Sequence, residues 1–230
     1  MKGVLLRFVF DARFVAHEHD LWALGEYRST IEAQLEYLRA QDEVRTMAEL
    51  VELGLSDDDA SRSGAWQRLD DRAERIHPRL FRGPYLVSLW GCYEATFLNV
   101  AESIAHERKT PLQHKDIRGE SALSRAKKYF EDYLGIAFES DARRGERIAD
   151  LYVMRNAFAH ANGLLKAHNA DRQNKIAAVV RRNPTILLDS GFVIPSAEYI
   201  DAAYQDVNSS ARDLIGRVRG GPAFHAEGID

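Results

Sequence analysis

The sequence contains a single cysteine, Cys92, among its 230 residues. A lone cysteine cannot form a disulfide within the chain, so we expect a reducing compartment and a small, buried Cys92 side chain. The sequence also lacks an HExxH pair, a CxxC pair and a glycine-rich phosphate loop. These are common signatures of metal centres and nucleotide cofactors, so we expect neither a metal nor a cofactor.

Long hydrophobic runs are lacking as well. The most apolar stretch, Leu86–Ala101, is interrupted by Glu94 and Asn99 and is too short to cross a bilayer. Near the start, Arg7 and Asp11 interrupt the apolar residues before a secretory signal can form. The net charge of −4 gives no general attraction to nucleic acid. We therefore expect a cytoplasmic protein without membrane contact, in which any RNA contact needs a local basic patch.

Apolar residues make up 45% of the chain, which is enough for one sizeable core and predicts a single domain over residues 1–230. Residues 21–163 have the apolar spacing or composition of a helical bundle, with a polar linker at Ser56–Gly64. The segments expected to be helical are His19–Gly54, Pro84–Lys109, Glu120–Ile136 and Asp141–Gly163.

Residues 164–195 have a different pattern. Lys175–Val180 and Thr185–Ile194 are short and rich in β-branched residues, which predicts a small antiparallel hairpin or a three-stranded meander. Residues 196–220 return to helical spacing, with Ser196 as the N-cap, and residues 221–230 form a loose tail. The expected fold is mainly α: a bundle of four to five helices with a short antiparallel β insert before the C-terminal helix.

Arg155 is the unusual residue of the fourth predicted helix. At about 100° per residue, it falls in the middle of an arc formed by the apolar residues Ile148, Leu151, Tyr152, Phe158 and Ala159. A guanidinium there is costly unless it is paired or lines a cleft. One explanation is a buried ion pair with Glu94, the only charge in its own apolar run; the other is a cleft in which Arg155 binds phosphate. Both can hold together.

Asn156 and His160 lie four residues apart, so they share a face beside Arg155. A single histidine near a helix end is often only a surface residue. An imidazole, however, can transfer protons at neutral pH. An arginine one and a half turns away can hold a phosphodiester, and the Asn156 amide can donate to a phosphate oxygen or orient the imidazole.

The stretch "RNAFAH", Arg155 to His160, resembles the signature of HEPN domains, which are bundles of four or five helices. The resemblance covers roughly residues 21–163, and the remainder is similar to the extension of bacterial HEPN families of the abortive-infection or RiboL-PSP-associated kind. It implies a metal-independent endoribonuclease acting in phage defence or as a toxin. His160 is then the general acid/base, Arg155 neutralises the scissile phosphate and Asn156 contacts it, while the RNA 2′-OH attacks the phosphorus.

The resemblance also implies partners: RNA, a second copy that completes a composite cleft, and an inhibitor or antitoxin protein. One branch of the family carries a tyrosine, the site of modification by its antitoxin, two residues after the histidine. Here that position is Asn162, which departs from the pattern. The alternative function is a non-catalytic HEPN bundle that binds RNA, a nucleotide or a protein.

Two further groups of residues could bear on function. A basic patch that tracks RNA could form, although solvated helix faces and turns explain these residues equally well. Its candidates are Arg125, Lys127, Lys128, Arg143, Arg144, Arg181 and Arg182. His17, His19 and Asp20 have metal-ligand chemistry, but a polar segment that precedes a helix is the favoured interpretation.

Overall fold

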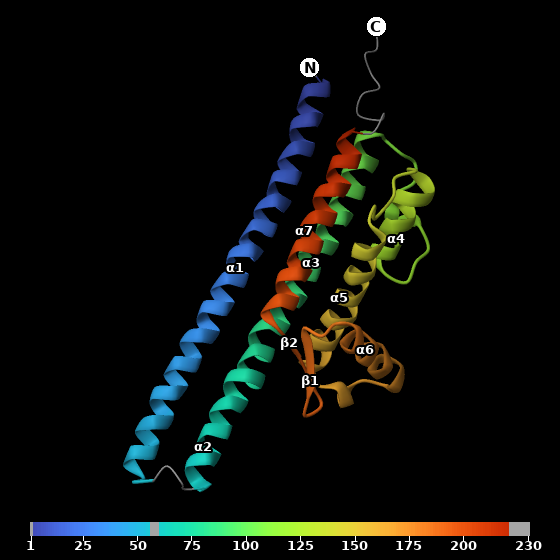
Figure 1. Cartoon of the computed structure of the whole chain (residues 1–230). Helices are drawn as coiled ribbons and strands as arrows, with labels where there is room; N and C mark the ends of the chain where they lie inside the picture. The colour runs from blue at the N-terminus through green and yellow to red at the C-terminus, as the bar shows by residue number, and fades with distance from the viewer. Residues whose placement is uncertain (1, 56–59, 221–230) are drawn as a thin grey trace. The chain divides into compact units, whose positions relative to one another are not determined.

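The computed structural model describes residues 2–55 and 60–220, with side chains for residues 15–55 and 64–219 (Figure 1). A mainly α chain with a short antiparallel hairpin before the C-terminal helix is confirmed. The elements are α1 (Lys2–Glu52), α2 (Ala60–Asp70), the π-helical turn η1 (Asp71–Ile76), α3 (His77–Glu107), η2 (His114–Asp116), α4 (Ala122–Lys128), the π-helical turn η3 (Tyr129–Tyr133), α5 (Ala142–Ala161), η4 (Leu165–Ala167), α6 (Ala170–Arg182), β1 (Ile186–Asp189), β2 (Phe192–Pro195) and α7 (Ala197–Gly220).

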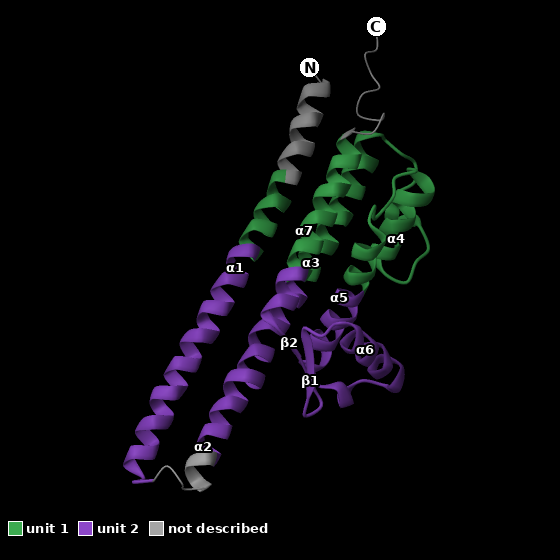
Figure 2. Cartoon of the chain, in the orientation of Figure 1, with its two compact units in different colours: residues 1–24, 89–149, 203–230 green, residues 25–88, 150–202 purple. Residues whose placement is uncertain are grey.

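The chain divides into two compact units, which are described separately (Figure 2). Unit 1 comprises residues 1–24, 89–149 and 203–230, and unit 2 comprises residues 25–88 and 150–202. Helices α1, α3, α5 and α7 each contribute residues to both units. The motif residues Arg155, Asn156 and His160 all belong to unit 2.

Unit 1 is built around aromatic side chains. The ring of Phe97 on α3 lies 4.5 Å from the ring of Tyr93 and 4.5 Å from the ring of Phe138, between centroids. Phe130 of η3 contacts Phe97 edge-on at 6.5 Å. Such rings bury a large apolar area and favour these tilted contacts, so they form a connected aromatic part of the core of this unit. Burial also raises the pKa of Tyr93, which keeps its hydroxyl protonated.

Unit 2 packs the first part of α3 closely against α5. Gly83 is buried, and a Cβ at this position would lie 2.3 Å from Cδ1 of Phe158. Glycine is therefore required for the backbone of α3 to approach the Phe158 ring. Around this contact, Tyr85 and Leu86 of α3 and Met154 of α5 are fully buried. The motif helix is thus held by its own apolar face.

The β hairpin is attached to the end of α5. β1 and β2 pair antiparallel, with Asp189 opposite Phe192, and the turn residues Ser190 and Gly191 have φ of 51° and 81°. Positive φ at both positions is the geometry of a two-residue type I′ turn. On the other side of β2, the Val193 amide donates to the Gly163 carbonyl at 2.9 Å. The hairpin therefore fixes the chain immediately after the motif.

Four sequence-based expectations were wrong in detail. Helix α1 begins at Lys2 rather than at His19, so His17, His19 and Asp20 lie inside this helix and not in a segment before it. Lys175–Val180, expected as a strand, lies inside α6, because Asn169 caps that helix and its buried residues Ile176 and Val179 are three apart, on one helical face. The polar linker is partly helical, since residues 60–64 belong to α2; residues 56–59 and the predicted tail lie outside the described residues. Helix α3 begins at His77 and carries Pro84 in its interior.

Two predicted helix ends, at Gly54 and at Ser196, are confirmed. Gly54, expected to end the first helix, has φ of 65° just after α1 ends. The Ser196 side chain accepts a hydrogen bond from the Tyr199 amide at 3.2 Å, as expected of the N-cap of α7.

Candidate functional site

Helix α5 carries the motif near its C-terminal end. The helix runs from Ala142 to Ala161, and the next two residues, Asn162 and Gly163, both have positive φ, of 47° and 77°. A Cβ on Gly163 would lie 2.8 Å from the Phe158 ring and 3.0 Å from the Val193 carbonyl oxygen. Gly163 therefore ends the helix as predicted, and it allows the hairpin to pack against that end.

Arg155 lies at the edge of the buried face of α5, rather than in its middle. Met154, Ala157 and Phe158 are buried, whereas Tyr152 and Ala159, which were expected to share the apolar arc, are exposed. The buried face is thus displaced around the helix from the predicted arc. Arg155 is consequently half-buried at the boundary between core and surface.

The Arg155 guanidinium is bonded to the neighbouring residue of the motif. Its Nη1 donates to Oδ1 of Asn156 at 2.7 Å, while its Nε is buried without a hydrogen-bond partner among the described residues. Because an arginine can only donate, it occupies the acceptor of the Asn156 amide and leaves the Nδ2 donor for another group. The pair therefore presents donors, an arrangement suited to an anion.

His160 is exposed on the last turn of α5, five residues after Arg155. A residue of α3 contacts the chain just beyond His160. Nη1 of Arg79 donates a hydrogen bond to the carbonyl oxygen of Asn162 at 2.9 Å. The Arg79 guanidinium also lies 4.2 Å from the centroid of the Phe192 ring on β2. Arg79 thus contacts both the end of the motif helix and the hairpin, and its cation–π contact adds to that link.

Most arginines of unit 2 are neutralised by a carboxylate. Their ion pairs are Arg28 with Asp201, Arg39 with Glu74, Arg45 and Arg72 with Asp42, Arg68 with Glu49, Arg75 with Asp71 and Asp189, Arg82 with Glu32, and Arg182 with Asp150. In the described part of unit 2, Arg79, Arg155, Arg172 and Arg181 make no such pair. Two of these four, Arg79 and Arg155, contact residues of the motif helix or its end, so positive charge that is not compensated is retained at the motif.

Arg79 was missed by the sequence analysis. It lies 76 residues before Arg155 in the segment "HPRLFRG", which has no distinctive spacing. Its relation to the motif becomes visible only once α3 and α5 are packed together at Gly83 and Phe158.

Glu94, the predicted partner of Arg155, is half-buried on α3. It belongs to unit 1 and Arg155 to unit 2, so the ion pair between them stays a prediction. Asn162 lies two residues after His160. Its positive φ favours asparagine over a bulky side chain.

The predicted basic patch is divided between the units, and some of its residues form ion pairs with carboxylates. In unit 1, Arg144 is buried and forms ion pairs with Glu139 and Asp213. These bonds raise the pKa of Arg144; they also lower that of Glu139, although burial alone would raise it.

The remaining patch candidates are closer to the surface. Arg125 is half-buried, with Nε buried, while Lys127, Lys128 and Arg143 are exposed. Lys127 lies 4.0 Å from Glu131, and Lys128 Nζ donates to the Arg118 carbonyl at 3.0 Å. In unit 2, Arg181 is exposed beside the ion-paired Arg182.

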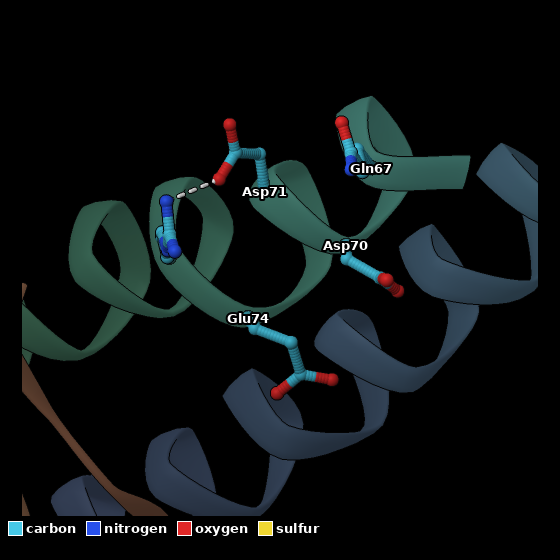
Figure 3. Close-up of a pocket in the computed structure, with 5 residues that line it drawn as sticks. Gln67, Asp70, Asp71 and Glu74 are labelled. Carbon is cyan, nitrogen blue, oxygen red and sulfur yellow. Dashed lines mark hydrogen bonds and ion pairs between the residues drawn. The ribbon is translucent and has the colours of Figure 1, made fainter. Parts of the chain in front are cut away.

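A hollow beside α2 and η1 has the wrong charge for a polyanion. It is lined by Gln67, Asp70, Asp71, Glu74 and Arg75, and Arg75 is bonded to Asp71 at 2.6 Å (Figure 3). Figure 3 shows Asp70 and Glu74 pointing away from that pair. The lining carries three carboxylates and one arginine, and its charge stays negative even with Arg39 paired to Glu74, so we do not place RNA there.

Metal binding has no visible basis in the part of the chain described. No group of three histidine, cysteine, aspartate or glutamate side chains there could hold a metal ion. His17 is buried, with Nε2 at 3.1 Å from Asn99 Nδ2, whereas His19 and Asp20 are exposed. Across the described residues, no helix is long and apolar enough to span a membrane.

Comparison of the chain with family models, with curated proteins and with solved structures finds no match.

Proposed function

We propose that the chain is a metal-independent endoribonuclease of the HEPN type, with its reaction centred on α5. The observation that carries the proposal is the donor arrangement at the motif. Arg155 retains its charge, Asn156 has its acceptor filled by Arg155, and the His160 imidazole is exposed on the following turn. A phosphodiester needs cationic and amide donors, and its cleavage needs a group that transfers protons near neutral pH.

In the proposed reaction, the 2′-oxygen of a ribonucleotide attacks the adjacent phosphorus. A general base removes the 2′-OH proton, the bond to the 5′-oxygen breaks, and a general acid protonates the leaving 5′-oxygen. The products are a 2′,3′-cyclic phosphate and a 5′-hydroxyl. His160 serves as proton-transfer group, and a second copy of the chain supplies the second imidazole. Arg155 offsets the charge that develops on the phosphoryl oxygens, and the need for a 2′-OH confines the reaction to RNA.

We assign Arg79 as a positioning residue in the same proposal. Its bond to the Asn162 carbonyl and its contact with Phe192 fix the chain two residues beyond His160. Its uncompensated charge also adds to the attraction for phosphate. Defence or toxin action, with an inhibitor protein as a partner, is the biological role that accompanies this type of activity.

The test is a cleavage assay on mixed RNA with EDTA present. We expect the wild type to cut and His160→Ala to be inactive while its circular dichroism spectrum is unchanged. The matched control is His19→Ala, because His19 is also an exposed histidine and lies in the other unit. If a folded wild-type protein binds RNA and does not cut it, the chain is instead a binding module.

A further inference from the structure

Helix α1 has a second apolar face that the described residues leave exposed. Ile31 and Leu50 of this helix are buried in the chain, whereas Tyr37, Val44, Met47 and Val51 are 57%, 68%, 42% and 76% exposed. Ala40 between them is exposed too. At about 100° per residue, these five residues lie roughly half a turn from Ile31. We call them the outer stripe of α1, and all of them belong to unit 2.

The spacing of the outer stripe is that of a coiled coil. Its residues follow in steps of three and four, as the a and d positions of a heptad do, and Thr30 and Ala33, both exposed, continue the same register. Isolated exposed apolar residues are ordinary on a protein surface. A run in heptad register is suited to another α-helix, whose side chains fit between its own.

The residues at the a positions favour a parallel two-stranded arrangement. Thr30, Val44 and Val51 at three of the four a positions are β-branched. Valine at a is typical of parallel two-stranded coiled coils, in which leucine occupies d. Here the d positions hold the small residues Ala33 and Ala40 and the unbranched Met47, so two copies of the helix can approach closely at the alanines.

The borders of the outer stripe select the orientation. On the g side lie Glu36 and Glu43, and on the e side lie the uncharged Gln41 and Ala48. In an antiparallel pair of this helix, g positions face each other and glutamate meets glutamate. In a parallel pair, g faces e, so Glu36 meets Gln41 of the second copy and can accept its amide hydrogen bond. The acidic border also disfavours an anionic membrane surface.

We propose that the outer stripe joins two copies of this chain in a parallel, in-register, two-stranded coiled coil. The proposal stands on the exposure and the heptad register of α1, and it does not depend on the proposed ribonuclease activity. It concerns α1, so it is separate from the cleft expected at α5.

The first test is sedimentation equilibrium of the full chain at micromolar concentration. We expect the wild type to sediment as a dimer, or as a larger assembly where copies also pair at the α5 cleft. Val44→Glu should lower that mass by at least half with an unchanged circular dichroism spectrum. Leu187→Glu is the matched control, because Leu187 is also exposed in unit 2, on β1, and this variant keeps the wild-type mass. A monomeric wild type, or a Val44→Glu assembly as large as that of the wild type, overturns the proposal.

The second test fixes the orientation by cross-linking in a Cys92→Ser background. Thr30→Cys and Val51→Cys, made separately, lie near opposite ends of the stripe. In a parallel, in-register pair each cysteine faces its own copy, so both variants form covalent dimers under mild oxidation. An antiparallel pair brings at most one of them together with itself. A cross-link in only one variant, or in neither, contradicts the proposed geometry.

Discussion

Replacing Gly83 by alanine tests the packing that holds the motif helix. The added methyl carbon would lie 2.3 Å from Cδ1, 2.7 Å from Cε1 and 2.9 Å from Cγ of Phe158, whereas ordinary contact begins at 3.4 Å. The ring or one of the two helices must therefore move by about 1 Å. Phe158 is buried, so no open space receives the ring.

The magnitude follows from two opposing effects. Overpacking of a core costs about 3 kcal/mol at the upper end of its usual range. Alanine favours a helix interior over glycine by about 1 kcal/mol. We expect Gly83→Ala to lower the free energy of unfolding by about 2 kcal/mol, which for a chain of this size lowers the melting temperature by about 4–8 °C.

Urea denaturation followed by circular dichroism measures this change. Gly91→Ala is the matched control on the same helix, because no described atom beyond its chain neighbours and its own helical turn lies within 4 Å of the added carbon, and we expect it to stabilise the chain by up to about 1 kcal/mol. In a Phe158→Ala background the clash is absent, so Gly83→Ala should no longer destabilise. A Gly83→Ala protein as stable as Gly91→Ala would refute the packing described here.

Three further predictions concern a positioning residue, a buried histidine and the thiol. Arg79→Gln should lower kcat/KM for RNA at least tenfold, while the free energy of unfolding falls by about 1 kcal/mol, which is the contribution of one hydrogen bond. If Arg79→Gln were as active as the wild type, Arg79 would have no role in the proposed site. Burial lowers the pKa of His114, so below its ordinary value of 6.5 the unfolded chain binds more protons than the folded one. The free energy of unfolding should then fall as pH drops from 7 towards the lowered pKa, by at most about 1.4 kcal/mol per pH unit from this group. Urea titrations at several pH values should show that the free energy of unfolding of His114→Gln depends less steeply on pH than that of the wild type. Burial raises the pKa of Cys92 to about 11, so iodoacetamide should modify the native protein slowly at pH 7 and rapidly after unfolding; fast native labelling would mean that Cys92 is not shielded.

The helices that could be predicted from the sequence have local signals that agree with one another. The C-terminal end of α5 was indicated by Gly163, and the start of α7 by Ser196 and the acidic first turn that follows it. α6 was missed because Lys175–Val180 is short and apolar, a pattern that fits a strand as well as a helix. The side chain of Asn169 caps α6 and favours the helix, but Asn169 lies before that apolar run, so the run alone did not indicate it.

The chemistry of the site was predictable only in part. Arg155, Asn156 and His160 were singled out by type and spacing, because they share one helix, and their role in catalysis stays a prediction. The buried face of that helix depends on what packs against it, so the apolar arc was misplaced and Tyr152 proved to be exposed. Arg79 could not be found, since its contact with Asn162 joins segments 83 residues apart through tertiary packing.

The central claim is that His160 transfers protons in cleavage beside a 2′-OH. The most direct measurement uses a DNA oligonucleotide that contains a single ribonucleotide, incubated with EDTA, with the product ends identified by mass spectrometry. The account predicts one cut, on the 3′ side of the ribonucleotide, which leaves a 2′,3′-cyclic phosphate in wild type and in His19→Ala but is absent in folded His160→Ala. A cut at deoxynucleotides, or the same cut by His160→Ala, would contradict it.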